Sequence, residues 1–144
     1  MRHVFMLPLL LVALLTAWSS AYGLEPVPGV RAQLGLQADS SWNGNKIEYP
    51  SGQAEVTGML IEVDPGQETG WHTHSVPSFA MIIEGQLEVT LEDGRKKLLK
   101  AGDFLAEVID VPHMGRNVGK ETVKLVVFYA GAKGMTLTEK LEDR

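Results

Sequence analysis

Three histidines are the residues of this chain best suited to chemistry. The chain has four histidines and no cysteine, and His3 falls in an N-terminal segment that we expect to be removed. His72 and His74 are separated by one residue in a segment with the pattern of a strand, so their side chains should project from the same face. A third imidazole from a distant strand, His113, would complete a facial set of metal ligands. Surface decoration is the alternative interpretation of an isolated His-x-His pair.

Other kinds of catalytic or binding site find less support in the sequence. The absence of cysteine excludes disulfides, thiolate metal sites and a cysteine nucleophile. Helical zinc proteases need two histidines four residues apart, which this chain lacks, and it has neither a Gly-x-Ser-x-Gly elbow nor a phosphate-binding loop. A formal charge of −5, without a basic run, argues against a nucleic-acid partner.

The elements that must position these histidines are predicted to be strands. Apolar and β-branched runs alternate with turn signals every 8 to 12 residues or so from Trp42 onward, which is typical of an all-β sandwich or barrel. Asp93-Gly94 predicts a hairpin, and only the tail, Leu137 to Asp143, is compatible with a helix. Strands are predicted at residues 53–63, 70–74, 79–83, 86–91, 95–99, 104–109 and 122–129.

The N-terminus has the three-part order of a secretory signal peptide. A short basic start precedes the apolar run Val4 to Trp18, and small residues follow it. That run is shorter than the roughly 20 residues that span a bilayer, so cleavage after Ala21 or Gly23 is favoured over a membrane anchor. We expect a secreted or periplasmic protein with a mature charge near −6 and no stable membrane span.

The length is enough for one domain with a substantial core. The predicted organisation is a cleaved signal peptide at 1–21, an N-terminal arm with the first strand at 22–52, a barrel at 53–131 and a C-terminal tail at 132–144.

The surroundings of the first two histidines resemble the first motif of the cupin superfamily. That motif has five residues between a glycine and His-x-His, three or four residues between His-x-His and a glutamate, and six residues between that glutamate and a second glycine. Gly66, His72, His74 and Gly85 match these positions. Ser78 stands where the family has its metal-binding glutamate.

The surroundings of the third histidine resemble the second cupin motif. Gly102, His113 and Asn117 match it, whereas Val108 and Asp110 replace the proline and glycine of the family pattern. The resemblance covers roughly residues 55 to 130. The resemblance implies an all-β, cupin-type double-stranded β-helix, or jelly-roll barrel. It also implies that all three histidines of the mature chain are metal ligands.

The departure at Ser78 bears on function. Cupins with three histidines and no glutamate resemble the diketone-cleaving and thiol-oxidising dioxygenases, which favours Fe(II) as the divalent first-row ion, with Mn, Ni, Zn and Cu as alternatives. A neutral ligand set leaves the charge of the ion uncompensated, so a small anionic chelator such as an enolate or carboxylate is expected. The alternatives are a non-catalytic cupin that binds a metal or small ligand and a structural cupin whose histidines bind nothing tightly.

Two residues are candidates for a catalytic role. Alternation from the turn at Gly102 points the Glu107 side chain to solvent, and the cost of burying an unpaired carboxylate favours the same orientation. If Glu107 faced the metal instead, it would be the best candidate for a surrogate acid or base. Ser78 either bonds a metal-bound water or packs in the wall. A small-molecule ligand and, since small cupins often pair, a homodimer are the expected partners. Four apolar residues flank the ligands and either line a pocket or pack in the core: Trp71, Phe79, Met81 and Met114.

Overall fold

The computed structural model describes residues 28–141 of the chain, and the predicted signal peptide, residues 1–21, lies outside them. A compact unit begins at Leu34. Residues 28–33 belong to a separate unit and contain a turn at Pro28 and Gly29. No helix in the described part of the chain is long and apolar enough to cross a membrane.

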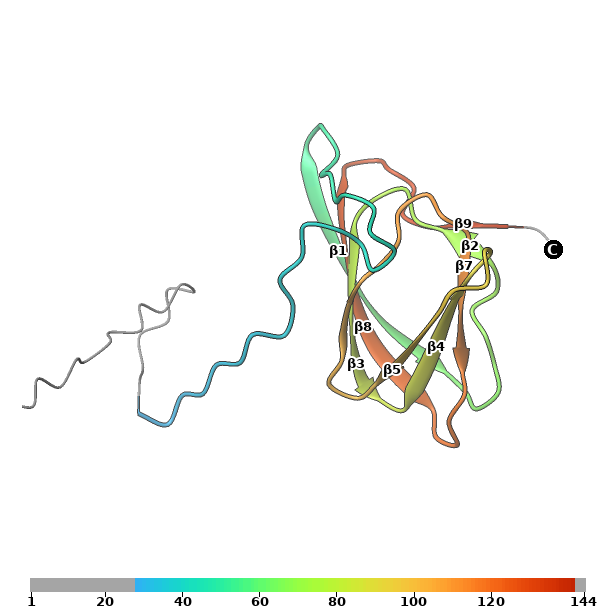
Figure 1. The fold of residues 1–144 in the computed structure, drawn as a ribbon. Coiled ribbons are helices and arrows are strands. Elements are labelled where there is room, and N and C mark those ends of the chain that lie inside the picture. Colours follow the sequence, from blue (N-terminus) through green and yellow to red (C-terminus); the bar gives the residue numbers. More distant parts are fainter. Residues whose placement is uncertain (1–27, 142–144) are drawn as a thin grey trace, which may run out of the picture. The chain divides into compact units, whose positions relative to one another are not determined.

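Two antiparallel sheets face each other in the compact unit (Figure 1), in the all-β, double-stranded β-helix arrangement that the sequence predicts. The four-stranded sheet has the order β1-β8-β3-β6, with bounds Ala54–Val63, Val123–Ala132, Ser78–Glu84 and Phe104–Ala106. The five-stranded sheet has the order β5-β4-β7-β2-β9, with bounds Lys96–Lys100, Gln86–Leu91, His113–Asn117, His72–Thr73 and Glu139–Lys140.

Strand alternation separates the core from the outer surface. In β8 the buried residues Val123, Leu125, Val127 and Tyr129 alternate with more exposed ones, because successive side chains of a strand point to opposite faces. Inward residues of β3 and β4 meet them from both sheets, among them Ala80, Ile82, Leu87 and Val89. The two sheets are therefore held together by an apolar layer of the kind that sandwiches and barrels share.

Asn117 fastens the end of β1 to the turn between β7 and β8. Its Nδ2 donates to the carbonyl oxygens of Val63 and Glu121, both at 2.8 Å, and its Oδ1 accepts from the backbone N–H of Gly119 at 2.9 Å. Asn117 is 1% exposed. Because its buried polar groups have no access to water, these hydrogen bonds take the place of hydration.

Left-handed backbone occurs in several turns, and two of them contain residues that the sequence patterns single out. The predicted hairpin at Asp93-Gly94 joins β4 to β5, with Gly94 at φ 86° and the Leu91 N–H donating to the Arg95 carbonyl at 2.9 Å. Asp110 has φ 55°, and it stands where the cupin motif has glycine. Aspartate is among the residues that tolerate the left-handed region of backbone conformation, so the turn can form with Asp110 in place of the glycine.

Two of the differences between the predicted and observed elements lie near the histidines. The tail is not helical where it is described: Glu139–Lys140 forms β9, which pairs with β2, because so short a segment gains more from completing a sheet than from an isolated helix. The strand predicted at 104–109 ends at Ala106. Beyond it the chain turns toward His74, whose carbonyl accepts from the Asp110 N–H at 2.8 Å.

Candidate metal centre

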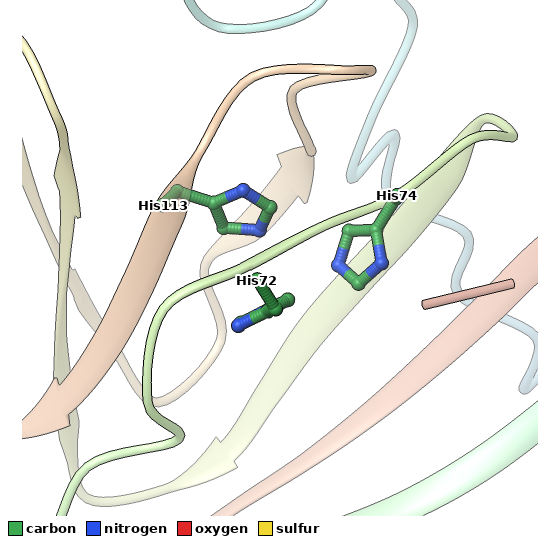
Figure 2. A group of neighbouring side chains, drawn as sticks. All are labelled: His72, His74 and His113. Atoms are coloured by element: carbon green, nitrogen blue, oxygen red, sulfur yellow. The ribbon is translucent and has the colours of Figure 1, made fainter. Parts of the chain in front are cut away.

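The three predicted histidines lie together at one end of the barrel. His72 on β2 is directly opposite His113 on β7, and His74 follows β2 by one residue. The ring centroids are 4.3 to 4.9 Å apart, and one ring nitrogen of each residue lies within 4.8 Å of the others. Figure 2 shows the three rings grouped between the strands. That they bind a metal ion stays a prediction.

Each imidazole is held through its Nδ1. His72 Nδ1 bonds to the Gly70 carbonyl at 2.9 Å, His113 Nδ1 to the Val111 carbonyl at 2.8 Å, and His74 Nδ1 to the Leu137 carbonyl at 3.2 Å. A carbonyl oxygen only accepts, so all three Nδ1 atoms carry the proton. Nε2 is then the nitrogen of each ring through which an ion could be bound, and this is how proteins orient histidines that ligate metals.

The surroundings of His113 indicate that a cation would fit between the three histidines. The Nε2 atom of His113 is buried and has no hydrogen-bond partner among the described residues, and a buried polar atom without a partner is costly. A cation coordinated by this nitrogen would satisfy it. The donor set, three imidazole nitrogens, suits the first-row divalent ions.

His72 is held in the neutral form. Burial lowers its pKa to about 4, and the nearby His113 and His74 act in the same direction, whereas the hydrogen bond to Gly70 and the charge of Glu107 partly oppose them. At neutral pH the ring is therefore unprotonated and able to ligate.

Chelator-treated protein is expected to lose stability as pH falls from 7 to 5. The unfolded chain binds a proton at His72 near pH 6.5, whereas the folded ring resists protonation, so the unfolded state gains protons first and the free energy of unfolding falls by on the order of 2 kcal/mol. Urea denaturation at both pH values measures this, and His72→Gln should flatten the dependence. An equal slope in that variant would contradict the assignment.

The structure corrects the expected orientation of Glu107. Phe104 lies on the outer face, so alternation places Leu105 and Glu107 inside. The Glu107 carboxylate is 13% exposed, and its Oε2 lies 2.8 Å from His74 Nε2 and 3.8 Å from His113 Nε2. Burial alone would raise its pKa, but interactions with His113 and His74 outweigh burial and hold the pKa below its ordinary range. The carboxylate is therefore ionised.

Ser78 lies behind this carboxylate. Its side chain is 1% exposed, and its Oγ–H donates to Glu107 Oε2 at 3.3 Å. The backbones are also joined, since the Glu107 N–H donates to the Ser78 carbonyl at 2.9 Å. The two candidate catalytic residues therefore form one unit beside the histidines.

A largely apolar cavity of about 590 Å³ reaches the histidines and Glu107. Four apolar residues that flank the ligands were expected either to line such a pocket or to pack in the core, and none of them lines it: Trp71, Phe79, Met81 and Met114. Met81 projects from the outer face of β3. Trp42, which precedes the first strand, does line it, and nothing in the local sequence pattern marked this role. The main apolar lining residues are Trp42, Met59, Ile61, Leu87, Val89, Leu125, Val127 and Leu137.

The chain belongs to the cupin superfamily: residues 59–129 match the cupin domain. Two curated proteins are similar to it. Over 113 residues it is 34% identical to the Oryzines biosynthesis cluster protein J of Aspergillus oryzae, covering 76% of this chain and 61% of that protein. Over 68 residues it is 38% identical to Polyketide synthase CurC of Streptomyces cyaneus, covering 46% and 44%. The chain thus spans less than two thirds of either relative.

Solved structures share the fold. A double-stranded β-helix protein of Klebsiella pneumoniae superposes with a TM-score of 0.50 at 24% identity, covering 65% of this chain and 91% of that one. Oxalate decarboxylase of Bacillus subtilis, described with Mn(II) centres, superposes with a TM-score of 0.52 at 21% identity, covering 60% and 24%.

Proposed function

We propose that this chain is an exported metal-dependent cupin that acts, like the three-histidine dioxygenases, on a small chelating enolate or carboxylate. The observation that carries the proposal is the convergence of three imidazoles whose Nδ1 atoms are all committed to hydrogen bonds, which makes Nε2 the nitrogen of each ring that would bind an ion. The manganese described in oxalate decarboxylase supports a divalent first-row ion. The three-histidine set favours Fe(II) among them.

Different residues of the chain would bind the ion, orient the substrate and supply negative charge. His72, His74 and His113 would bind the ion, which as a Lewis acid would polarise a chelating substrate and, as Fe(II), activate dioxygen. The apolar walls would exclude water and orient the substrate. Glu107 would supply a negative charge at the histidine end of the cavity, where the Ser78 hydroxyl donates to the Glu107 carboxylate.

The cavity indicates the shape of the ligand. A volume of about 590 Å³ lies within the range of pockets for drug-sized molecules, and its polar groups gather at the histidine end. This arrangement suits an anionic chelating head with an apolar body. The name of the relative Polyketide synthase CurC is consistent with products that combine these two features.

An aromatic β-diketone is expected to bind the metal-loaded protein more tightly than acetylacetone. Benzoylacetone has the same chelating head and carries a phenyl group in place of one methyl group, and burial of the phenyl group against Trp42 should improve affinity about tenfold. Titration of the chelate absorption band measures both affinities.

Trp42→Ala should remove that preference, whereas Leu98→Ala, which shortens an exposed side chain of β5, should keep it. Equal affinities for the two diketones in the unmodified protein would contradict the assignment of the apolar wall.

Elemental analysis of protein purified without a histidine tag tests the proposed function, followed by oxygen uptake with the β-diketones. About one divalent ion per chain together with turnover supports an enzyme. Metal without turnover of any chelator tested would favour the alternative, a metal- or ligand-binding cupin. No metal retained from solutions of Fe(II), Mn(II) or Zn(II) would reject both.

Export is proposed from the signal-like residues 1–21 alone. Expression of the full chain in a Gram-negative host should give a mature protein in the periplasmic fraction that begins near residue 22 or 24. Recovery of the uncleaved chain from the cytoplasm would contradict this.

We also infer a homodimer that pairs through the outer face of the four-stranded sheet. Leu60, Val126, Met81 and Phe104 lie side by side across all four strands. Six large apolar side chains of this face are 36% to 69% exposed, on the order of 500 Å² together, which is at the upper end for a monomer. A second copy offers the same apolar face, as two-fold pairing requires. The six are Val56, Leu60, Met81, Ile83, Phe104 and Phe128.

Light scattering after size exclusion tests the dimer. The unmodified protein and Leu98→Arg, in the other sheet, should be dimeric, whereas Phe128→Arg should be monomeric. A monomeric unmodified protein would reject the pairing.

A further inference from the structure

We propose that Glu107 is a fourth ligand of the metal ion, so that the chain supplies from the end of β6 a carboxylate that a three-histidine site would lack. This inference rests on the proposed metal binding by His72, His74 and His113. It changes the expected site from three neutral ligands to three neutral ligands and one anionic one.

The distances around Glu107 carry the proposal. Metal–nitrogen and metal–oxygen bonds of 2.0 to 2.2 Å put two adjacent ligand atoms about 3 Å apart when the angle between them is near 90°. Glu107 Oε2 lies 2.8 Å from His74 Nε2 and 3.8 Å from His113 Nε2. With respect to His74 Nε2 the oxygen is therefore placed as a neighbouring ligand would be, and with respect to His113 Nε2 it lies within about 1 Å of that spacing.

Apart from the two histidines, the described surroundings offer Glu107 no charged partner. Among the described residues, its side chain has polar contacts with His74, His113 and Ser78. No lysine or arginine forms an ion pair with it in this part of the chain, although Glu84 and Glu88 on the outer surfaces both have a lysine partner. A buried carboxylate needs a charged partner, and a divalent ion between the histidines would be that partner.

Ser78 acts as a positioning residue. Its hydroxyl is too short to replace a carboxylate ligand, but it donates to the same Oε2 that faces the histidines. A hydrogen bond from behind fixes the rotamer of a ligating carboxylate in the manner usual for metal sites. Position 78 would therefore keep a role at the site while the ligand itself comes from position 107.

The fourth ligand also refines the class of substrate. A divalent ion bound by three imidazoles keeps a charge of +2, whereas one bound by three imidazoles and a carboxylate keeps +1. The complete site would then be neutralised by one negative charge. It should prefer monoanionic chelators, such as a diketonate, over dianionic ones, such as oxalate.

Glu107→Gln tests the proposal, because glutamine keeps the size of the side chain and loses its charge. Titration calorimetry with Zn(II) on chelator-treated protein should show affinity weakened by about 10- to 100-fold. The visible absorption spectrum of the Co(II)-loaded protein should also change, since that spectrum reports the ligand set. Glu84→Gln, which removes the same charge from the outer surface, should behave as the unmodified protein does.

The double variant Ser78→Glu/Glu107→Gln distinguishes loss of a metal ligand from misfolding as the cause of weaker Zn(II) binding. A carboxylate at position 78 should restore at least part of the lost Zn(II) affinity. Unchanged affinity in Glu107→Gln, or weaker affinity with an unchanged Co(II) spectrum, would overturn the assignment of Glu107 as a ligand. Failure of the unmodified protein to bind Zn(II) or Co(II) would instead overturn the proposed function on which it rests.

Discussion

Replacing His113 with alanine is expected to reduce divalent metal affinity at least 100-fold. The ring supplies one of three converging nitrogens, and its Nε2 has no other hydrogen-bond partner among the described residues. Its removal leaves an incomplete set of ligands, and loss of even a group outside the ligand set costs 10- to 100-fold in typical sites. Calorimetric titration of chelator-treated protein with Zn(II) measures the change.

Thr90→Val is the matched control for this variant. Thr90 lies on β4 beside the histidine strand, and its buried hydroxyl also has no hydrogen-bond partner in the described part of the chain. An isosteric apolar replacement should therefore leave metal binding unchanged. Metal affinity within twofold of the unmodified value in His113→Ala would show that the three-histidine assignment is wrong.

Asn117→Ala is expected to destabilise the fold by about 3 kcal/mol, the largest stability effect that we expect from a single polar side chain here. The variant leaves two carbonyl oxygens and one N–H without the partners that Asn117 supplies, and each buried group left unpaired costs about 1 to 3 kcal/mol. Urea denaturation of metal-free protein at pH 7.5 measures the free energy of unfolding.

Thr122→Val provides the comparison at the same junction. The Thr122 hydroxyl donates to Asp64 at 3.1 Å, but this bond is exposed, so its loss should cost less than about 1 kcal/mol. Similar losses in the two variants would mean that burial of the Asn117 bonds does not determine their contribution.

Local patterns in the sequence were sufficient for most of the barrel. The hairpin at Asp93-Gly94 was predicted because a left-handed glycine turn is a local property, and it is confirmed. The spacing of His72, His74 and His113 within the cupin motifs identified the residues that the fold brings together. The hairpin signal is contained in two neighbouring residues, and each cupin motif in one continuous segment, from Gly66 to Gly85 and from Gly102 to Asn117.

The features that local patterns missed depend on contacts between distant segments. Glu107 faces inward because β6 has Phe104 on its outer face, which the turn at Gly102 alone does not determine. Trp42 reaches the cavity from a segment before the first strand, where its backbone N–H donates to the Ala106 carbonyl at 3.1 Å. The tail forms a strand because the edge of β2 is available to it.

The same tail has a consequence for when the site can form. His74 is oriented by the Leu137 carbonyl and by the Thr138 hydroxyl at 3.1 Å, and both leave the ribosome after every strand of the two sheets except β9. Since synthesis runs from the N-terminus, a nascent polypeptide cannot orient His74 in this way until Leu137 and Thr138 have left the ribosome. Loading with the ion should therefore follow emergence of the β9 segment, in whichever compartment the chain then folds.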